Sequence, residues 1–197
     1  MPLLFDAYIP AYVFDDGNCL FRSISLAYSG SVEHHDELRL RTAIEIGLHR
    51  SLYDKDDSQY RYPFRDDSRI KISDYVTLCH NVTKSRMLSD VNTILALSAV
   101  VGLPIQMLCP PINCDLFELP ELTRVVAGRG VDKEADKLTI MWTTTGSVEQ
   151  IEKININHIV PLLNKKNQVM CSGRECIKFT GSDIKVEPMN INERLNV

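Results

Sequence analysis

The sequence predicts an α+β fold, or a mixed sheet with helices packed on it, and two observations support this prediction. Helical periodicity comes first along the chain, ending near residue 101. Short β-branched or apolar runs follow at 105–108, 138–144 and 154–163. Helices that precede strands in this way are typical of α+β domains. The length of 197 residues is enough for one domain with a proper core.

The first elements are an extended segment, a loop and a helix. Residues 1–14 alternate loosely and carry aromatic side chains, which predicts extended backbone. The run DDGN at 15–18 consists of residues that favour turns. From Cys19 the pattern becomes helical as far as Tyr28, before a break at Gly30.

The segment from 34 to 53 has the clearest helical pattern, and 54–69 is polar and aromatic with no period, which predicts a surface excursion. Residues 72–82 form a short predicted helix. We expect the 34–53 helix to bury the apolar residues that recur at spacings of three and four, namely Leu40, Ala43, Ile44, Gly47, Leu48 and Leu52.

A further helix is expected to begin at an N-cap, Ser89, and to run to Val101, where Gly102 and Pro104 end it. After the strand at 154–163 the composition becomes polar. We therefore predict a main domain at 1–163 and a C-terminal extension at 164–197, which is either an arm packed on the domain or the start of a linker.

Composition excludes several classes of protein. A net charge of −4 and a pI of about 5.7 argue against a nucleic-acid partner, which needs a basic face. No apolar run reaches the roughly 18 residues of a membrane span, and the N-terminus has no secretory pattern. The six cysteines are scattered, which predicts reduced thiols in an intracellular compartment, cytoplasm or nucleus. The pairs Cys109/Cys114 and Cys171/Cys176 lack the tighter spacing of zinc ligands, so no metal is expected.

Cys19 is the candidate nucleophile. A thiol in the first turn of a helix lies where unsatisfied amides favour negative charge, which lowers its pKa. The preceding Asp16, Gly17 and Asn18 can direct backbone N–H groups at the same point, as an oxyanion hole requires. Asp16 and Asn18 are expected to build the loop through turn contacts and not to act as catalysts. The alternative interpretation is a buried cysteine with no chemical role.

A thiol nucleophile needs a base, usually a histidine. Among the five histidines, His34, His35 and His49 lie in or beside an exposed-looking helix, and His80 lies in an irregular stretch. His158 alone lies inside a late β-type segment, where a sheet would hold it rigidly. We therefore predict His158 as the base.

The octet DGNCLFRS at 16–23 resembles the cysteine motif of the ovarian tumour (OTU) family of deubiquitinases. ELRLR at 37–41, the block from Leu95 to Ile105, and Asn157-His158 match later elements of that family in order. The segments ELRLRTAIEIGLHRSLY, LTIMWTT and NHIVPLL resemble vertnin-like OTU domains more closely than they resemble other OTU domains. Vertnin-like OTU domains occur in animal genes and transposable elements. This likeness covers residues 10–163.

The resemblance implies a papain-like OTU fold with a small central sheet between helical lobes. It implies hydrolysis of isopeptide bonds after the C-terminal glycine of ubiquitin, through a thioester on Cys19 and a water activated by His158. Ubiquitin or polyubiquitin is the expected partner, with ubiquitin-like modifiers as a further class and without nucleic acid or membrane. No cofactor is required.

One departure from the family pattern concerns the third catalytic residue. OTU enzymes commonly carry Asp or Asn two positions after the histidine, but Val160 occupies that position here, and Ile156 lies two positions before it. The third member is therefore unassigned, with Asp6, Asp15 and Asp16 as upstream acids that could serve. The departure keeps open a non-catalytic OTU-fold binding module within a larger polypeptide. A papain-like peptidase without ubiquitin selectivity is the third class.

Overall fold

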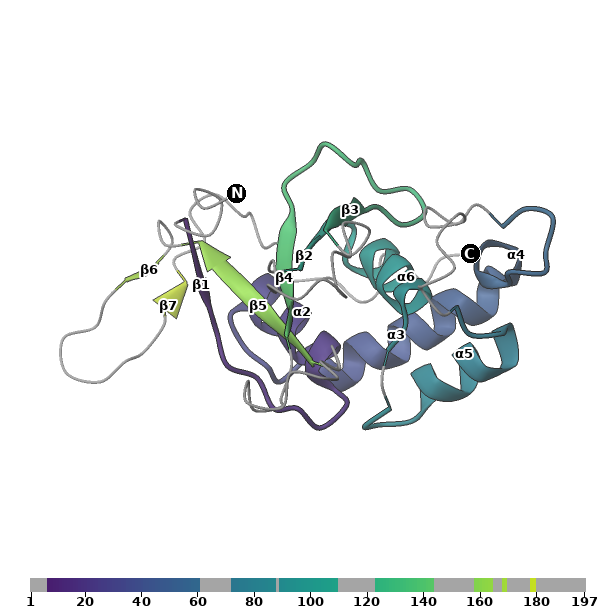
Figure 1. Ribbon diagram of the computed structural model, residues 1–197, viewed down its shortest axis with the longest axis horizontal. Helices are drawn as coiled ribbons and strands as arrows, with labels where there is room; N and C mark the ends of the chain where they lie inside the picture. Colours follow the sequence, from purple (N-terminus) through teal and green to yellow (C-terminus); the bar gives the residue numbers. More distant parts are fainter. Residues whose placement is uncertain are drawn as a thin grey trace, which may run out of the picture. The chain divides into compact units, whose positions relative to one another are not determined.

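The computed structural model describes residues 7–60, 72–87, 89–109, 123–143 and 158–164, together with the strand backbones at 168–169 and 178–179. Figure 1 shows the elements along the chain. In order, they are β1 (Tyr8–Pro10), α2 (Cys19–Ser29), α3 (His35–Leu48), α4 (Arg50–Tyr53), α5 (Tyr75–Thr83), α6 (Val91–Val101), β2 (Ile105–Leu108), β3 (Arg124–Val126), β4 (Leu138–Thr143), β5 (His158–Asn164), β6 (Gln168–Val169) and β7 (Lys178–Phe179).

Packing divides the chain into two compact units. One runs from Pro10 to Leu162, and the other combines Met1–Ile9 with Leu163–Val197. The described part of the second unit includes β6 and β7, which form an antiparallel pair with Gln168 opposite Phe179. The division into a catalytic domain at 1–163 and an extension at 164–197 stays a prediction.

The main sheet has five strands in the order β1-β5-β4-β2-β3. Strands β2 and β4 are parallel, with Ile105 opposite Leu138, whereas β3 pairs with β2 and β5 pairs with β4 in antiparallel fashion. A mixed sheet that follows and packs against helices confirms the predicted α+β class. In the described part of the chain, no helix is long and apolar enough to cross a bilayer.

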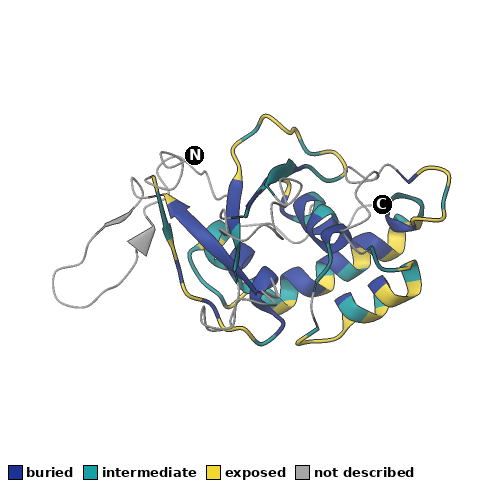
Figure 2. Ribbon diagram, viewed as in Figure 1, coloured by how far each residue is buried: buried dark blue, intermediate teal, exposed yellow. Residues whose placement is uncertain are grey.

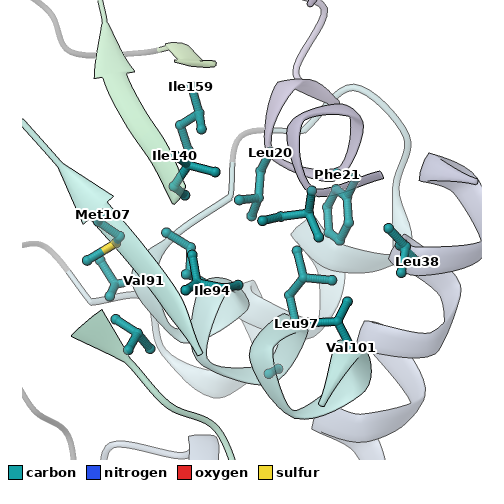
Figure 3. Close-up of a cluster of buried hydrophobic side chains, with 14 of the residues drawn as sticks. Leu20, Phe21, Leu38, Val91, Ile94, Leu97, Val101, Met107, Ile140 and Ile159 are labelled. Carbon is teal, nitrogen blue, oxygen red and sulfur yellow. The ribbon is translucent and has the colours of Figure 1, made fainter. Parts of the chain in front are cut away.

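The core lies between the sheet and helices α2 and α6. Figure 3 shows Leu20 of α2 and Ile94 of α6 directed toward Met107 of β2 and Ile140 of β4. Leu20, Ile94, Met107 and Ile140 are all buried. Because apolar side chains from helices and strands meet here, the start of α2 is fixed relative to the sheet.

The prediction of the buried face of α3 was wrong for most of its residues, since only Ala43 and Leu52 of the predicted stripe pack against the core. Leu40, Ile44 and Leu48 of the predicted stripe are 63%, 51% and 73% exposed. Figure 2 shows this outward face in yellow along α3. The buried residues are instead Leu38, Arg39, Thr42, Glu45 and Ile46. Hydrophobic periodicity selected the wrong face because the inward face carries polar residues that find partners inside the domain.

The helix boundaries also differ from the predictions in two places. The helix expected at 34–53 ends at Leu48, and a short α4 begins after His49, whose φ of −123° and ψ of 45° lie outside the helical range. The N-cap of α6 is Asp90, not Ser89, because the Asp90 carboxylate accepts a hydrogen bond from the Thr93 N–H at 3.0 Å. Strand β3 was not predicted, since its three residues give no readable period.

Candidate active site

The loop before α2 is built around the Asp16 carboxylate. Oδ1 accepts a hydrogen bond from the Asn18 backbone N–H at 3.1 Å, and Oδ2 accepts one from Arg22 Nη2 at 3.0 Å. Partial burial opposes ionisation of Asp16, but the hydrogen bonds from Arg22 and the Asn18 backbone outweigh it and lower the pKa of this carboxyl. Asp16 therefore has the contacts of a loop-building residue.

Gly17 lets this loop approach a second loop closely. Its φ is +79°, a left-handed conformation that favours glycine. A Cβ on Gly17 would lie 2.2 Å from the backbone oxygen of Arg86, which is closer than two non-bonded atoms can approach. The turn at 84–87 thus packs directly on the loop that precedes Cys19.

Asn18 is the N-cap residue of α2, but its side chain does not cap the helix. Its Oδ1 accepts hydrogen bonds from Arg39 Nη2 at 2.9 Å and from the Arg86 N–H at 3.1 Å. The first intrahelical bond of α2 runs from the Arg22 N–H to the Asn18 carbonyl. The amides of the first turn therefore remain uncapped by the Asn18 side chain, beside the thiol of Cys19.

Cys19 is the first residue of α2 and is 5% exposed. Burial raises the pKa of its thiol above the ordinary value. The backbone N–H groups of Ile159, Leu20 and Cys19 act in the opposite direction without overcoming burial, and the Asp16 charge adds to the rise. The expectation that the helix start gives a net lowering of the thiol pKa was wrong, because the amides favour the thiolate less than burial disfavours it.

His158 begins the described part of β5, opposite Thr143 of β4, and is 6% exposed. Burial lowers the pKa of its imidazole, against opposing effects of the Asp15 charge and the Val13 carbonyl. Its Nδ1 has no hydrogen-bond partner among the described residues. The imidazole is therefore held neutral, with one nitrogen that can accept a proton.

The start of α2 and the start of β5 are joined directly. Ser23, one turn after Cys19, donates a buried hydrogen bond from Oγ to the Ile159 carbonyl at 3.0 Å. The N–H of the same Ile159 favours the Cys19 thiolate. The residue next to His158 thus contacts the helix that carries Cys19, so the elements of the two predicted site residues lie together.

The other four histidines lie elsewhere on the domain. His80 is an exposed residue of α5, and the His34 side chain is exposed at the N-cap of α3. His49 lies 3.6 Å from Glu45, between α3 and α4. His35 is half-buried, with Nδ1 2.8 Å from the Val32 carbonyl, and not solvated as expected.

OTU enzymes commonly carry their third site residue two positions after the histidine, which here is Val160, and its surroundings are apolar. Val160 is buried in the hydrophobic core, so it cannot orient the imidazole. Of the upstream acids, Asp15 acts on His158 by its charge, while Asp16 is engaged in the loop. Asp6, Ile156 and Asn157 lie outside the described residues.

Several residues that shape this site could not be predicted from the sequence. Arg39 of α3 donates a hydrogen bond to the Gly17 carbonyl of the loop, and Ser23 of α2 donates one to the Ile159 carbonyl of β5. The Arg86 backbone packs on Gly17. ELRLR carries only a family resemblance, and no periodic signal marks Arg39 because it lies beside the predicted apolar stripe. Ser23 belongs to the DGNCLFRS octet, which was the one available signal for it.

Solved structures of OTU domains resemble this chain. The OTUD1 OTU domain matches with a TM-score of 0.54 at 17% identity, covering 83% of this chain and 90% of that one. The viral OTU domain protease from Taggert virus matches with a TM-score of 0.52 at 14% identity, covering 83% of each chain. The chain therefore has the fold of the OTU domains.

The family follows from the sequence model for the OTU domain of vertnin, which matches residues 10–143. The chain belongs to this vertnin OTU-domain family, which confirms the resemblance inferred from the DGNCLFRS octet and its companion phrases. A search of curated proteins found no relative by sequence.

Proposed function

We propose that the protein is a deubiquitinase, a thiol-dependent hydrolase of isopeptide bonds at the C-terminus of ubiquitin. The observation that supports this most strongly is the hydrogen bond between α2, which begins at Cys19, and β5, whose described part begins at His158, in an OTU-family domain. Ubiquitin or polyubiquitin is the partner that the family resemblance suggests, with ubiquitin-like modifiers as a further class.

The proposed reaction starts from a neutral pair. His158 accepts the thiol proton as Cys19 Sγ attacks the carbonyl carbon of the terminal glycine, and the resulting oxyanion lies at the uncapped amides of α2. Collapse breaks the C–N bond, and the departing lysine amine takes the proton from His158. Water, deprotonated by His158, then attacks the thioester carbonyl. The C–S bond breaks, the Cys19 thiolate takes the proton from His158, and ubiquitin leaves with a free carboxylate.

A ubiquitin probe with a C-terminal electrophile tests the proposal. The wild-type protein should gain the mass of one ubiquitin, and Cys19→Ala should gain none while keeping the unfolding midpoint of the wild type. In turnover assays, His158→Ala should lose several orders of magnitude, whereas His80→Ala, a matched change at an exposed histidine, should stay within about a few-fold of wild type.

The outcomes separate the three classes of protein. A folded wild-type chain that the probe does not label would contradict the proposal and indicate a non-catalytic OTU-fold module. Cleavage of unrelated peptides as fast as ubiquitin would indicate a peptidase without ubiquitin selectivity. Ubiquitin cleavage by Cys19→Ala at even about a tenth of the wild-type rate would rule out Cys19 as the nucleophile.

A further inference from the structure

Arg39 is a buried cation behind the loop that precedes Cys19. It lies on the inward face of α3, is 5% exposed, and its guanidinium stacks on the Phe21 ring with Cζ 4.3 Å from the ring centroid. In the described part of the chain, its hydrogen bonds run to neutral oxygens, and its Nε has no partner. Burying an arginine without a hydrogen-bonded carboxylate is costly, so this position calls for an explanation.

The guanidinium joins two loops from different parts of the chain. Nη2 donates to the Gly17 carbonyl and to Asn18 Oδ1, each at 2.9 Å. Nη1 donates to the Lys84 carbonyl at 2.9 Å, in the turn that packs on Gly17. The planar fork of an arginine can span both loops at once, which the point charge of a lysine cannot do.

The contact with Asn18 has a consequence for the start of α2. An asparagine at an N-cap normally accepts a hydrogen bond from an amide of the first turn. Here Arg39 and the Arg86 N–H engage that oxygen, so the first-turn amides stay uncapped by Asn18. The N–H groups of Cys19 and Leu20 belong to this turn and favour the ionised thiol.

Arg39 also acts on Cys19 through its charge. Burial lowers the pKa of the guanidinium, while the charges of Asp36, Asp16 and the ionised Cys19 act in the opposite direction. Electrostatic interaction is mutual, so the arginine favours the thiolate by the same energy. The same positive charge would favour an oxyanion formed at the start of α2.

We propose that Arg39 is a positioning residue for the thiol reaction. Its fork holds loop 15–18 against turn 84–87 so that the α2 amides remain open to the oxyanion, and its charge favours the anionic states of the reaction. The part that concerns substrate turnover rests on the proposed deubiquitinase function, whereas the coupling to the Cys19 thiol does not.

The test compares Arg39→Met, Arg39→Lys and the control Arg41→Met. Methionine keeps the long stem on Phe21 and removes the charge, and lysine keeps the charge and removes the fork. Arg41 lies on the same helix and pairs with Glu37 at the surface, at 2.8 Å. Three measurements are made on each folded variant: kcat and KM on a fluorogenic amide of ubiquitin, the pH midpoint of Cys19 alkylation by iodoacetamide followed by peptide mass, and the urea midpoint.

Arg39→Met should lower kcat by about 10²–10³-fold, the loss typical of a missing oxyanion contact, with little change in KM. Its Cys19 alkylation midpoint should move to higher pH. Arg39→Lys should restore the alkylation midpoint but recover only part of kcat, because charge returns without the fork. Arg41→Met should match the wild type in all three measurements.

The proposal would be overturned if folded Arg39→Met had both an unchanged alkylation midpoint and a kcat within about threefold of wild type. If Arg39→Met does not fold, Arg39→Lys decides: a kcat equal to wild type would show that the fork is not needed and would overturn it. If the wild type does not cleave the ubiquitin amide but the alkylation midpoint still shifts in Arg39→Met, the deubiquitinase proposal fails and the coupling of Arg39 to Cys19 stands.

Discussion

Burial moves the pKa values of Cys19 and His158 in opposite directions, and the result is an uncharged pair at neutral pH. The thiol pKa is raised, so Cys19 stays protonated, and the imidazole pKa is lowered, so His158 stays unprotonated. Many cysteine proteases instead hold a preformed thiolate–imidazolium pair. In the proposed reaction, the proton transfer is therefore part of the chemical step, with His158 as the general base.

The neutral pair predicts the pH dependence of two measurements. Iodoacetamide alkylation of Cys19 in the free protein should rise toward alkaline pH with a midpoint above 9.0. The acid limb of kcat/KM should have a midpoint below 6.5, because His158 must be unprotonated to act as a base and its pKa lies below that value. An alkylation midpoint near neutral pH or below would instead indicate a preformed ion pair.

Asp15 and Asp16 should differ in their effects on the reaction. The Asp15 charge raises the pKa of His158, so Asp15→Asn should move the acid limb of kcat/KM further down in pH. Its loss of turnover should stay below the roughly 10²–10⁴-fold that a general base supplies, since the exposed charge is screened and the Val13 carbonyl remains.

Asp16→Asn is the matched change next to it and should act through the loop. It weakens the contact with Arg22 and should lower the urea midpoint of unfolding. If Asp16→Asn moved the acid limb and Asp15→Asn did not, the assignment of the charge that acts on His158 would be wrong.

At the scale of elements, the sequence predicts α2, α5, α6, β2 and β4 because their apolar pattern and terminating residues agree. The start of α2 at Cys19 follows from the turn residues before it, and its end follows from Gly30, which adopts the left-handed conformation. The inward face of α3 could not be found this way. It buries Arg39, Thr42 and Glu45. Arg39 and Glu45 find hydrogen-bond partners in distant segments that no local window contains, whereas Thr42 donates to the Leu38 carbonyl within the helix.

The orientation of α3 can be tested by a pair of substitutions. Ile46 is fully buried, so Ile46→Ala should destabilise the protein by about 2–4 kcal/mol through lost transfer energy and a cavity. Leu48 is 73% exposed, so Leu48→Ala should change the free energy of unfolding by no more than about 0.5 kcal/mol. Urea unfolding of both variants measures this, and the reverse order would mean that α3 is turned the other way.

At the scale of the whole molecule, the unit from Pro10 to Leu162 holds every described residue assigned to the site, from Val13 to Ile159. The sequence predicts this pairing of Cys19 with His158 from residue types and the family motif. The sequence could not predict how the loop is held. The hydrogen bonds to Asn18 come from α3 and from the turn after α5, which are distant in sequence and meet the loop only in the folded domain. They involve Arg39, Ser85 and Arg86.

The boundary predicted near residue 163 leads to a truncation experiment. A chain of residues 1–164 keeps β5 and all of the described site, so it should unfold cooperatively and react with the ubiquitin probe at the rate of the full chain. Circular dichroism and probe labelling are the measurements. An insoluble product, or labelling slower by about tenfold or more, would show that the C-terminal extension belongs to the catalytic unit.

The close approach of Gly17 to Arg86 affects how the DGNC motif should be used to judge relatives. A side chain at position 17 would collide with backbone whatever the protein does, so selection for folding alone is enough to retain the glycine. The same reasoning applies to Asn18, which holds the turn at 84–87. A relative that lost the thiol at position 19 would therefore still carry the glycine and the asparagine, so these two residues do not distinguish an enzyme from an inactive copy.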